Sequence, residues 1–173
     1  VGKDGGVFRV TDGLYEKFGP KRAIDTPLAE SAILGTAMGM AVAGLLPVAE
    51  MQFCGFSYVM FPQLEGNVSR IRSRSVGNLS APLVVRIPYG GGVRALEHHS
   101  ESPEATFAHL AGVKVVVPSG PRNARSLMLA AIRDPDPVIY LEPKRSYRAF
   151  KEEVPEPEEV KEIGKAEIVQ EGT

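Results

Sequence analysis

Short apolar blocks alternate along the chain with longer stretches in which apolar residues recur at helical spacing. The short blocks predict buried strands, and the longer stretches predict helices that pack against them. Gly and Pro mark most of the boundaries between the two kinds of segment. The pattern predicts strands at residues 21–24, 47–53, 82–88, 113–117 and 138–141, and helices at residues 7–18, 27–43, 60–74, 102–110 and 123–132.

This alternation is typical of an α/β fold with a mostly parallel sheet and helices on both faces. We expect residues 1–150 to form this domain. The segment 151–162 is acidic and rich in Pro, which is typical of a linker. Residues 164–173 begin a new strand pattern. We therefore expect residues 151–173 to contain the linker and the start of a second domain that is cut off.

Composition excludes several classes of protein. With 173 residues, 43% of them hydrophobic, the chain can bury a core, and its net charge of −1 gives no broad basic surface for nucleic acid or an anionic membrane. One cysteine rules out an intrachain disulfide and a cysteine-rich metal site. No signal peptide is visible, and the apolar run 32–48 is better explained as a buried helix than as a membrane span. These features suit the cytoplasm, or the mitochondrial matrix of a eukaryote.

Glu30 stands out because the residues after it, 31–48, are almost all small or apolar. Thr26 is expected to cap the helix and Pro27 to occupy its first turn. Glu30 then lies at a strand–helix junction, at the edge of a dry interior, where an acid can take part in chemistry. The alternative is an acid that only favours the helix dipole. A capping box does not explain it, because the box position would be Ala29.

A second group of polar residues also invites a functional explanation. Glu50 and Gln52 lie in an otherwise apolar strand, where they either bond a neighbouring loop or face a ligand. His98 and His99 precede the predicted helix at 102–110, and one of them could transfer protons. The alternative is two solvated loop histidines. A zinc site is a poor explanation, because adjacent histidines do not converge and no supporting Cys or His pair is present.

Three further patterns leave alternatives open. Gly35, Gly39 and Ala43 form a small-residue stripe that suits either packing within the subunit or a seam between subunits. The glycine run 90–92 follows a strand but lacks the spacing of a phosphate-binding loop, so a flexible loop is the simpler explanation. The Pro-broken acidic turn 133–137 is either an ordinary loop or an oxygen-rich cation site.

Several motifs go beyond pattern. The chain resembles the β subunit of the first component of 2-oxo acid dehydrogenase complexes, the thiamine-diphosphate-dependent decarboxylases of pyruvate or branched-chain 2-oxo acids. The resemblance covers nearly the whole chain and matches the pyrimidine-binding domain of that subunit. Its motifs are DTPLAE at 25–30, EMQF at 50–53, HSESPEA at 99–105, GVKVV at 112–116, AAIRD at 130–134 and LEPKRSYR at 141–148.

The resemblance implies roles for individual residues. Glu30 matches the glutamate that hydrogen-bonds a ring nitrogen of the cofactor's aminopyrimidine, which activates the thiazolium carbon. Phe56 matches the aromatic residue that packs on the pyrimidine, and Gln52 matches a cofactor-contacting position. His99 matches the active-site histidine implicated in reductive acylation of the lipoyl group. Positions around a structural potassium ion match Leu83, Ala131, Ile132, Asp134 and Asp136.

The resemblance also implies partners. The chain has no G-D-G…N motif for magnesium and diphosphate, and the family places those groups on an α subunit. We therefore expect a cofactor that lies across an α/β seam, an assembly of two α and two β chains, and docking on a lipoyl-bearing acyltransferase core. Residues 53–56 and Glu97 are similar to pyruvate-type members, whereas residues 99–105 and 141–148 are similar to branched-chain members. The sequence favours branched-chain or mixed specificity.

The sequence is also compatible with three other functions. A transketolase or deoxyxylulose-phosphate synthase relative would share the domain and Glu30. A non-catalytic β-like chain would only scaffold an α subunit. A nucleotide-binding module would use the glycine run 90–92.

Overall fold

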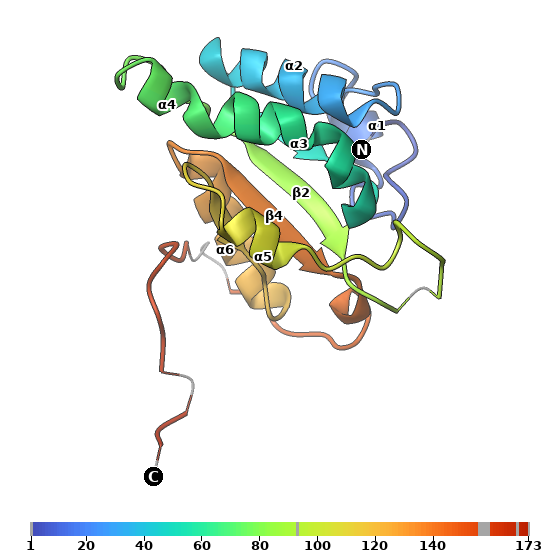
Figure 1. Ribbon diagram of the computed structural model, residues 1–173. Coiled ribbons are helices and arrows are strands. Elements are labelled where there is room, and N and C mark those ends of the chain that lie inside the picture. Colours follow the sequence, from blue (N-terminus) through green and yellow to red (C-terminus); the bar gives the residue numbers. More distant parts are fainter. Residues whose placement is uncertain (1, 93, 156–159, 169, 173) are drawn as a thin grey trace.

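The computed structural model describes residues 2–92, 94–155, 160–168 and 170–172. Within them, four strands form one parallel sheet in the order β1-β2-β4-β3 (Figure 1). The first residues of the three neighbouring strands lie side by side: Val84 of β2 pairs with Val48 of β1 and with Val138 of β4. The strands are β1 (Val48–Glu50), β2 (Val84–Tyr89), β3 (Lys114–Val116) and β4 (Val138–Pro143). The predicted mostly parallel α/β sheet is confirmed.

Helices cover both faces of the sheet, as the sequence predicts (Figure 1). Alternate residues of β2 and β4 point to opposite faces. Val85 and Ile139 belong to the core under α2, α3 and α5, and Val84 and Tyr140 belong to the core under α6. The helices are α1 (Leu14–Phe18), α2 (Glu30–Val42), α3 (Ser57–Gly66), α4 (Ile71–Arg74), α5 (Glu104–Ala108) and α6 (Pro121–Arg133), with 3-10 turns η1 (Cys54–Phe56), η2 (Val68–Arg70) and η3 (Lys144–Ser146).

The connections between strands leave a crevice at one edge of the sheet. The steps from β1 to β2 and from β2 to β3 run in one direction across the sheet, with their helices on the α2/α3 face. The step from β3 back to β4 uses α6 on the other face, as right-handed crossovers require. The chain after β4 continues along α6, where Glu152 accepts a hydrogen bond from the Arg122 amide at 3.0 Å. The chain therefore leaves β2 and β4 toward opposite faces of the sheet. This separation opens a crevice at the carboxyl ends of the two strands, and ligands bind at such crevices in parallel sheets.

Two predicted elements near the N-terminus are wrong. The helix predicted at 7–18 is reduced to α1, because Gly13 adopts a left-handed backbone (φ 80°) directly before it. The apolar residues that suggested a helix, Val7, Val10 and Phe18, are about half exposed. Residues 21–24 form no strand, because the amides of Arg22 and Ala23 bond back to the Gly19 carbonyl in a turn.

The long helices begin and end elsewhere than predicted. Thr26 does not cap α2, which starts at Glu30 with Ala29 at its N-cap and no side-chain cap. The residue before a proline favours extended backbone, which agrees with a start after Thr26 and Pro27. The helix predicted at 60–74 starts earlier, at Ser57, and is interrupted at Asn67, where the backbone leaves helical geometry (φ −127°, ψ −64°).

The described residues near the C-terminus differ from the pattern expected of a second domain. Residues 164–168 and 170–172 form no strand. Ile163 packs against the core under α6, and the Lys161 amide donates to Ser126 Oγ at 2.8 Å. The division at residue 150 stays a prediction. None of the helices in the described ranges combines the length and the apolar character that crossing a membrane would require.

Candidate active site

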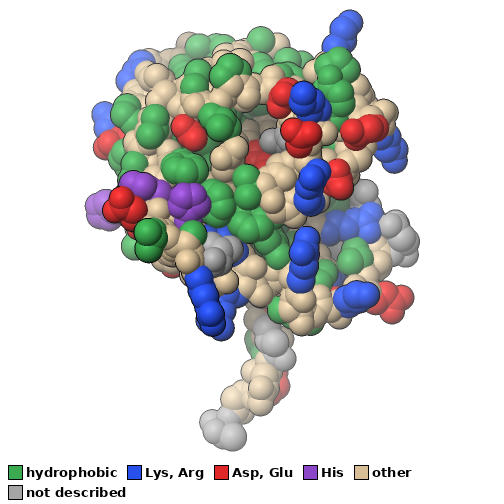
Figure 2. Space-filling view, turned by 90° about the vertical axis from the view of Figure 1, so that its right-hand side faces the viewer, with side chains coloured by type: hydrophobic (Ala, Val, Ile, Leu, Met, Phe, Trp, Pro, Cys, Tyr) green, Lys and Arg blue, Asp and Glu red, His purple; other side chains and the backbone are tan. Residues whose placement is uncertain are grey.

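Three rings gather where β1 leads into α3. Phe53 precedes η1 and Phe56 ends it, and their ring centroids lie 6.0 Å apart. The His99 imidazole meets Phe53 edge-on at 4.4 Å and Phe56 at 5.4 Å. Two of the residues singled out in the sequence, Phe56 and His99, are therefore in contact although 43 positions separate them. Figure 2, which looks onto the carboxyl ends of the strands, shows the histidines next to hydrophobic side chains at one side of this edge.

Gly55 allows the histidine loop to approach η1 closely. A Cβ atom at position 55 would overlap the backbone of His98. The Gly55 amide donates to the His98 carbonyl at 3.1 Å. His98 itself has a left-handed backbone (φ 68°), which is costly for a residue with a side chain and persists only where the surroundings hold it. The loop is thus fixed against η1 by its backbone.

The surroundings of His99 favour one neutral tautomer. Its Nδ1 lies 3.0 Å from the Glu97 carbonyl oxygen. A carbonyl only accepts hydrogen bonds, so Nδ1 carries the proton when the ring is neutral. The other nitrogen, Nε2, then has a free lone pair and can accept a proton.

Lys144 is a site residue that the sequence motifs did not identify, and it holds the same loop from η3. Its ammonium donates to the His99 carbonyl and lies 5.1 Å from the centre of the Phe53 ring. Burial lowers the pKa of Lys144. Because Lys144 comes from η3 at the end of β4, the loop is connected to the middle of the sheet. The only hint in the sequence is a lysine directly after a buried strand that ends in Pro143.

Glu30 lies at the first residue of α2 and is half-buried. Its neighbour Ser31 donates from Oγ to the Val59 carbonyl at 2.5 Å, which places the start of α2 beside the first turns of α3. Since α3 follows η1 directly, Glu30 borders the same corner of the fold as Phe56. No described residue pairs with the Glu30 carboxylate. It is therefore available to a ligand.

Gln52 is half-buried between β1 and η1, one residue from Phe53. The structure thus brings Phe56 and His99 into contact and places Gln52 on the segment that leads to them. Glu30 approaches from a separate helix.

A buried ion network lies behind this site. The Arg86 guanidinium donates to Glu142 at 2.6 Å and to Glu50 at 2.8 Å, and both carboxylates are at most one-tenth exposed. The Tyr147 hydroxyl donates to Glu142. Burial alone would lower the pKa of Arg86, but the Glu142 and Glu50 carboxylates raise it, so Arg86 stays charged. Of the two explanations offered for Glu50, the structure shows the structural one: an ion pair with the neighbouring strand.

A family model described as the transketolase pyrimidine-binding domain matches residues 2–149. The chain belongs to this family. The expected pyrimidine-binding domain is therefore confirmed over nearly the whole α/β unit.

Relatives of this pyrimidine-binding domain carry the name pyruvate dehydrogenase E1 component subunit beta. Those from Acholeplasma laidlawii, Mycoplasma genitalium and Staphylococcus aureus (strain Mu50) are 55%, 50% and 51% identical to it over 173, 173 and 172 residues. The chain spans 53% of the length of each of them. A solved structure titled split gene transketolase, inactive beta4 tetramer, superposes with a TM-score of 0.60 over 78% of this chain and 40% of that one. At 21% identity, that likeness concerns the fold alone.

The residues matched to a potassium site lie at the other end of the domain's sheet. Leu83 precedes β2, and its carbonyl accepts the Val138 amide at 2.9 Å. Ala131 and Ile132 end α6. The Asp134 carboxylate binds the Lys114 ammonium at 2.7 Å, and Asp136 binds Arg72 at 2.6 Å. The two carboxylates are thus engaged by cations, and among the described residues no cluster of three His, Cys, Asp or Glu could hold a metal. The potassium site, through backbone oxygens, stays a prediction.

Cys54 should react slowly with alkylating reagents in the folded domain. Burial raises the pKa of its thiol to about 12, and a hydrogen bond with Ser57 lowers it by less. The thiolate is the reactive form, so at pH 8 its population is about a thousandfold below that of a thiol with a pKa near 9. We expect little iodoacetamide labelling by mass spectrometry in native buffer and full labelling in urea. Equal labelling rates in the two solutions would contradict a buried, protonated thiol.

Proposed function

We propose that this chain is the pyrimidine-binding part of the β subunit of a thiamine-diphosphate-dependent 2-oxo acid dehydrogenase. The similarity that carries the proposal is 55% identity, over the whole chain, to a protein named pyruvate dehydrogenase E1 component subunit beta. The arrangement of Phe56, His99 and Glu30 supports it. A transketolase-like enzyme would share the fold, but the solved split gene transketolase is only 21% identical to this chain.

The residues present suit the aminopyrimidine of the cofactor. Phe56 offers a half-buried ring on which a flat heterocycle can pack. Glu30 offers a carboxyl group without a protein partner, at the edge of an apolar helix, to hydrogen-bond a ring nitrogen. Gln52 supplies an amide from the segment between them. When bound, thiamine diphosphate supplies the carbon nucleophile that attacks the 2-oxo acid.

His99 is placed to handle protons beside the ring. With Nδ1 bonded to the Glu97 carbonyl, Nε2 is the atom that accepts or returns a proton. Gly55, Lys144 and the rings of Phe53 and Phe56 fix the position of the imidazole. Fixed orientation of a general base lowers the entropy that the reaction must lose.

The proposal requires a partner. We propose that an α subunit supplies the groups that hold magnesium and diphosphate, in an assembly of two α and two β chains, because the relatives carry the name of a β subunit. Delivery of the acyl group to a lipoyl-bearing acyltransferase core completes the proposed role. The exposed apolar side chains of α1, Leu14 and Phe18, agree with a surface that a partner covers.

Turnover should appear only when the full-length protein is mixed with the α-like protein encoded beside it, thiamine diphosphate and magnesium. An artificial electron acceptor reports decarboxylation, with pyruvate and 3-methyl-2-oxobutanoate assayed side by side. The names of the relatives favour pyruvate over the branched-chain acid to which the sequence motifs pointed.

Each protein assayed alone is the control for a shared site. Faster turnover of pyruvate would assign the substrate, and faster turnover of 3-methyl-2-oxobutanoate would restore the branched-chain assignment. No turnover of either acid, in a mixture that light scattering shows to be assembled, would overturn the proposal and favour a scaffolding chain.

A further inference from the structure

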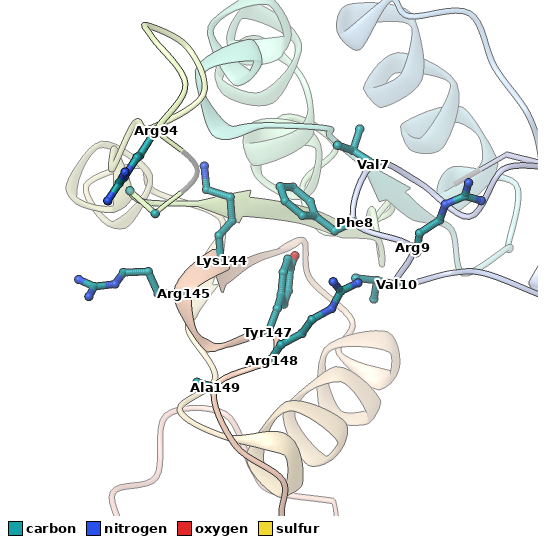
Figure 3. A pocket seen from close by; sticks show the side chains of 12 residues that line it. Val7, Phe8, Arg9, Val10, Arg94, Lys144, Arg145, Tyr147, Arg148 and Ala149 are labelled. Atoms are coloured by element: carbon teal, nitrogen blue, oxygen red, sulfur yellow. The ribbon is translucent and has the colours of Figure 1, made fainter.

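A basic groove opens at the carboxyl ends of β2 and β4, next to the candidate active site. Its volume is about 1140 Å³, and its walls come from the N-terminal loop, the loop after β2 and the segment after β4 (Figure 3). This is the crevice where the connections after β2 and β4 part to opposite faces. Parallel sheets bind ligands at such crevices. We call this feature the basic groove and define its charged lining as Arg9, Arg94, Lys144, Arg145 and Arg148.

Most of the charge of the basic groove has no counterpart, although Arg9 pairs with Asp12 at 3.9 Å and donates to the Asp4 carbonyl. Five of the 20 basic residues of the chain line it, and no acidic residue does, although the chain as a whole carries a net charge of −1. Arg94, Arg145 and Arg148 form no ion pair or hydrogen bond with any described residue. Guanidinium groups gathered without carboxylates repel one another, and a bound anion removes that cost.

The arrangement suits a ligand with several negative charges. In Figure 3, Arg94 and Arg145 lie at one end of the basic groove and Arg148 with Arg9 at the other, with Lys144 between them. A single carboxylate would neutralise one of these cations. A chain of phosphates carries several charges and offers three oxygen acceptors at its terminal group, which the planar guanidinium binds through paired hydrogen bonds.

The remaining lining is mostly apolar, and its two rings pack on neighbouring residues. The Phe8 ring lies 5.4 Å from the Tyr147 ring and 5.4 Å from the Phe53 ring. The Tyr147 hydroxyl is anchored on Glu142, and Val10 lines the same side. In the view onto this edge, Lys and Arg side chains surround hydrophobic ones in the lower half of the molecule (Figure 2). An organic body attached to the phosphates would have a wall to pack on.

We propose that the basic groove binds an organic triphosphate, a small molecule with three linked phosphates on a carbon skeleton. Its phosphates bind Arg94, Arg145 and Arg148, and its organic part packs on Phe8 and Val10. The volume of the basic groove, about 1140 Å³, is large enough to hold such a molecule. The site is separate from Phe56 and Glu30. It adjoins them through Lys144, which lines the basic groove and holds the His99 carbonyl.

Isothermal titration of the full-length protein tests this site with ATP, tripolyphosphate and polyglutamate as probes. The solutions contain no thiamine diphosphate, because its diphosphate would compete. We expect ATP to bind more tightly than tripolyphosphate, because only ATP reaches the apolar wall. The double variant Arg145→Gln/Arg148→Gln should weaken ATP binding at least about tenfold, since it removes two charge-assisted contacts.

The matched control is Lys21→Gln/Arg22→Gln, which removes the same charge from exposed positions outside the basic groove. It should leave the affinity for ATP unchanged. The variant Arg145→Lys/Arg148→Lys keeps the positive charges but cannot form the paired hydrogen bonds of a guanidinium. Its affinity for ATP should lie between those of the wild type and the glutamine variant. Both arginines are exposed, so the melting temperature should match that of the wild type.

Three results would overturn the proposal: no heat with either phosphate probe, an equal loss in both glutamine variants, or binding of polyglutamate alone. The last would assign the basic groove to an acidic polypeptide. Equal affinity for ATP and tripolyphosphate would refute a contact with an organic part. Because the readout is heat of binding without substrate, these results are independent of the turnover assay.

Discussion

Replacing Glu30 with Gln should lower 2-oxo acid turnover by the assembled enzyme at least about a hundredfold, the usual size of a lost proton-transfer group. The amide keeps the shape of the side chain but cannot exchange a proton with a ring nitrogen. The stability cost should be small, because an acid in the first turn of a helix contributes only about 0.3–1 kcal/mol. Steady-state kinetics with thermal unfolding of the same samples would measure both effects.

Glu16→Gln provides a matched control, since Glu16 is also an acid in the first turn of a helix, α1, and is exposed. It should leave turnover within about twofold and stability within about 0.5 kcal/mol of the wild type. If Glu30→Gln retained full turnover, Glu30 would be only a helix-dipole residue, and the chain would fit a scaffold better than an enzyme.

The parts of the fold that the sequence predicted correctly are those buried on both faces. β2 and β4 are mainly apolar because helices cover them on either side, and such runs stand out even though each contains one charged residue, Arg86 and Glu142. The segment 21–24 has only two adjacent apolar residues, Ala23 and Ile24, and only Ala23 is buried there, in a turn. Two adjacent apolar residues do not distinguish a strand from a turn that is anchored by one side chain.

Helical spacing failed at the N-terminus for a different reason. Val7, Val10, Leu14 and Phe18 have the spacing of an amphipathic helix, yet each is 39–52% exposed. Spacing records that side chains share a face, and it does not say whether the chain itself or a partner covers that face. Gly13 also permits the left-handed turn that ends any helix started earlier.

Some residues of the candidate active site could be identified from the sequence, and others could not. Glu30, Gln52, Phe56 and His99 were predicted because motifs in the sequence matched those of a family. Lys144 was missed because its partners lie elsewhere in the sequence: the His99 carbonyl is 45 positions away. The partner of Glu50 was missed for the same reason, since Arg86 lies 36 positions away and no local pattern connects them. Contacts between strands become visible only once the strand order is known.

Replacing Arg86 with Met should destabilise the protein by about 3–5 kcal/mol, because it leaves Glu50 and Glu142 charged, buried and without their cation. Urea unfolding would show a lower midpoint with an unchanged slope. The matched control is Arg72→Met, which breaks an ion pair with Asp136 whose side chains are 46% and 33% exposed. That change should cost less than about 1 kcal/mol.

A combined variant separates the ion network from the packing of Arg86. Glu50→Gln/Arg86→Met/Glu142→Gln removes both uncompensated charges, keeps an acceptor for the Tyr147 hydroxyl, and should recover at least about half of the loss. If Arg86→Met lowered the free energy of unfolding no more than Arg72→Met, water would reach the Glu50 and Glu142 carboxylates. That result would contradict their burial. An unrecovered loss in the combined variant would mean that the guanidinium acts mainly by filling space between the strands. Recovery would show that Arg86 is required because two carboxylates surround it.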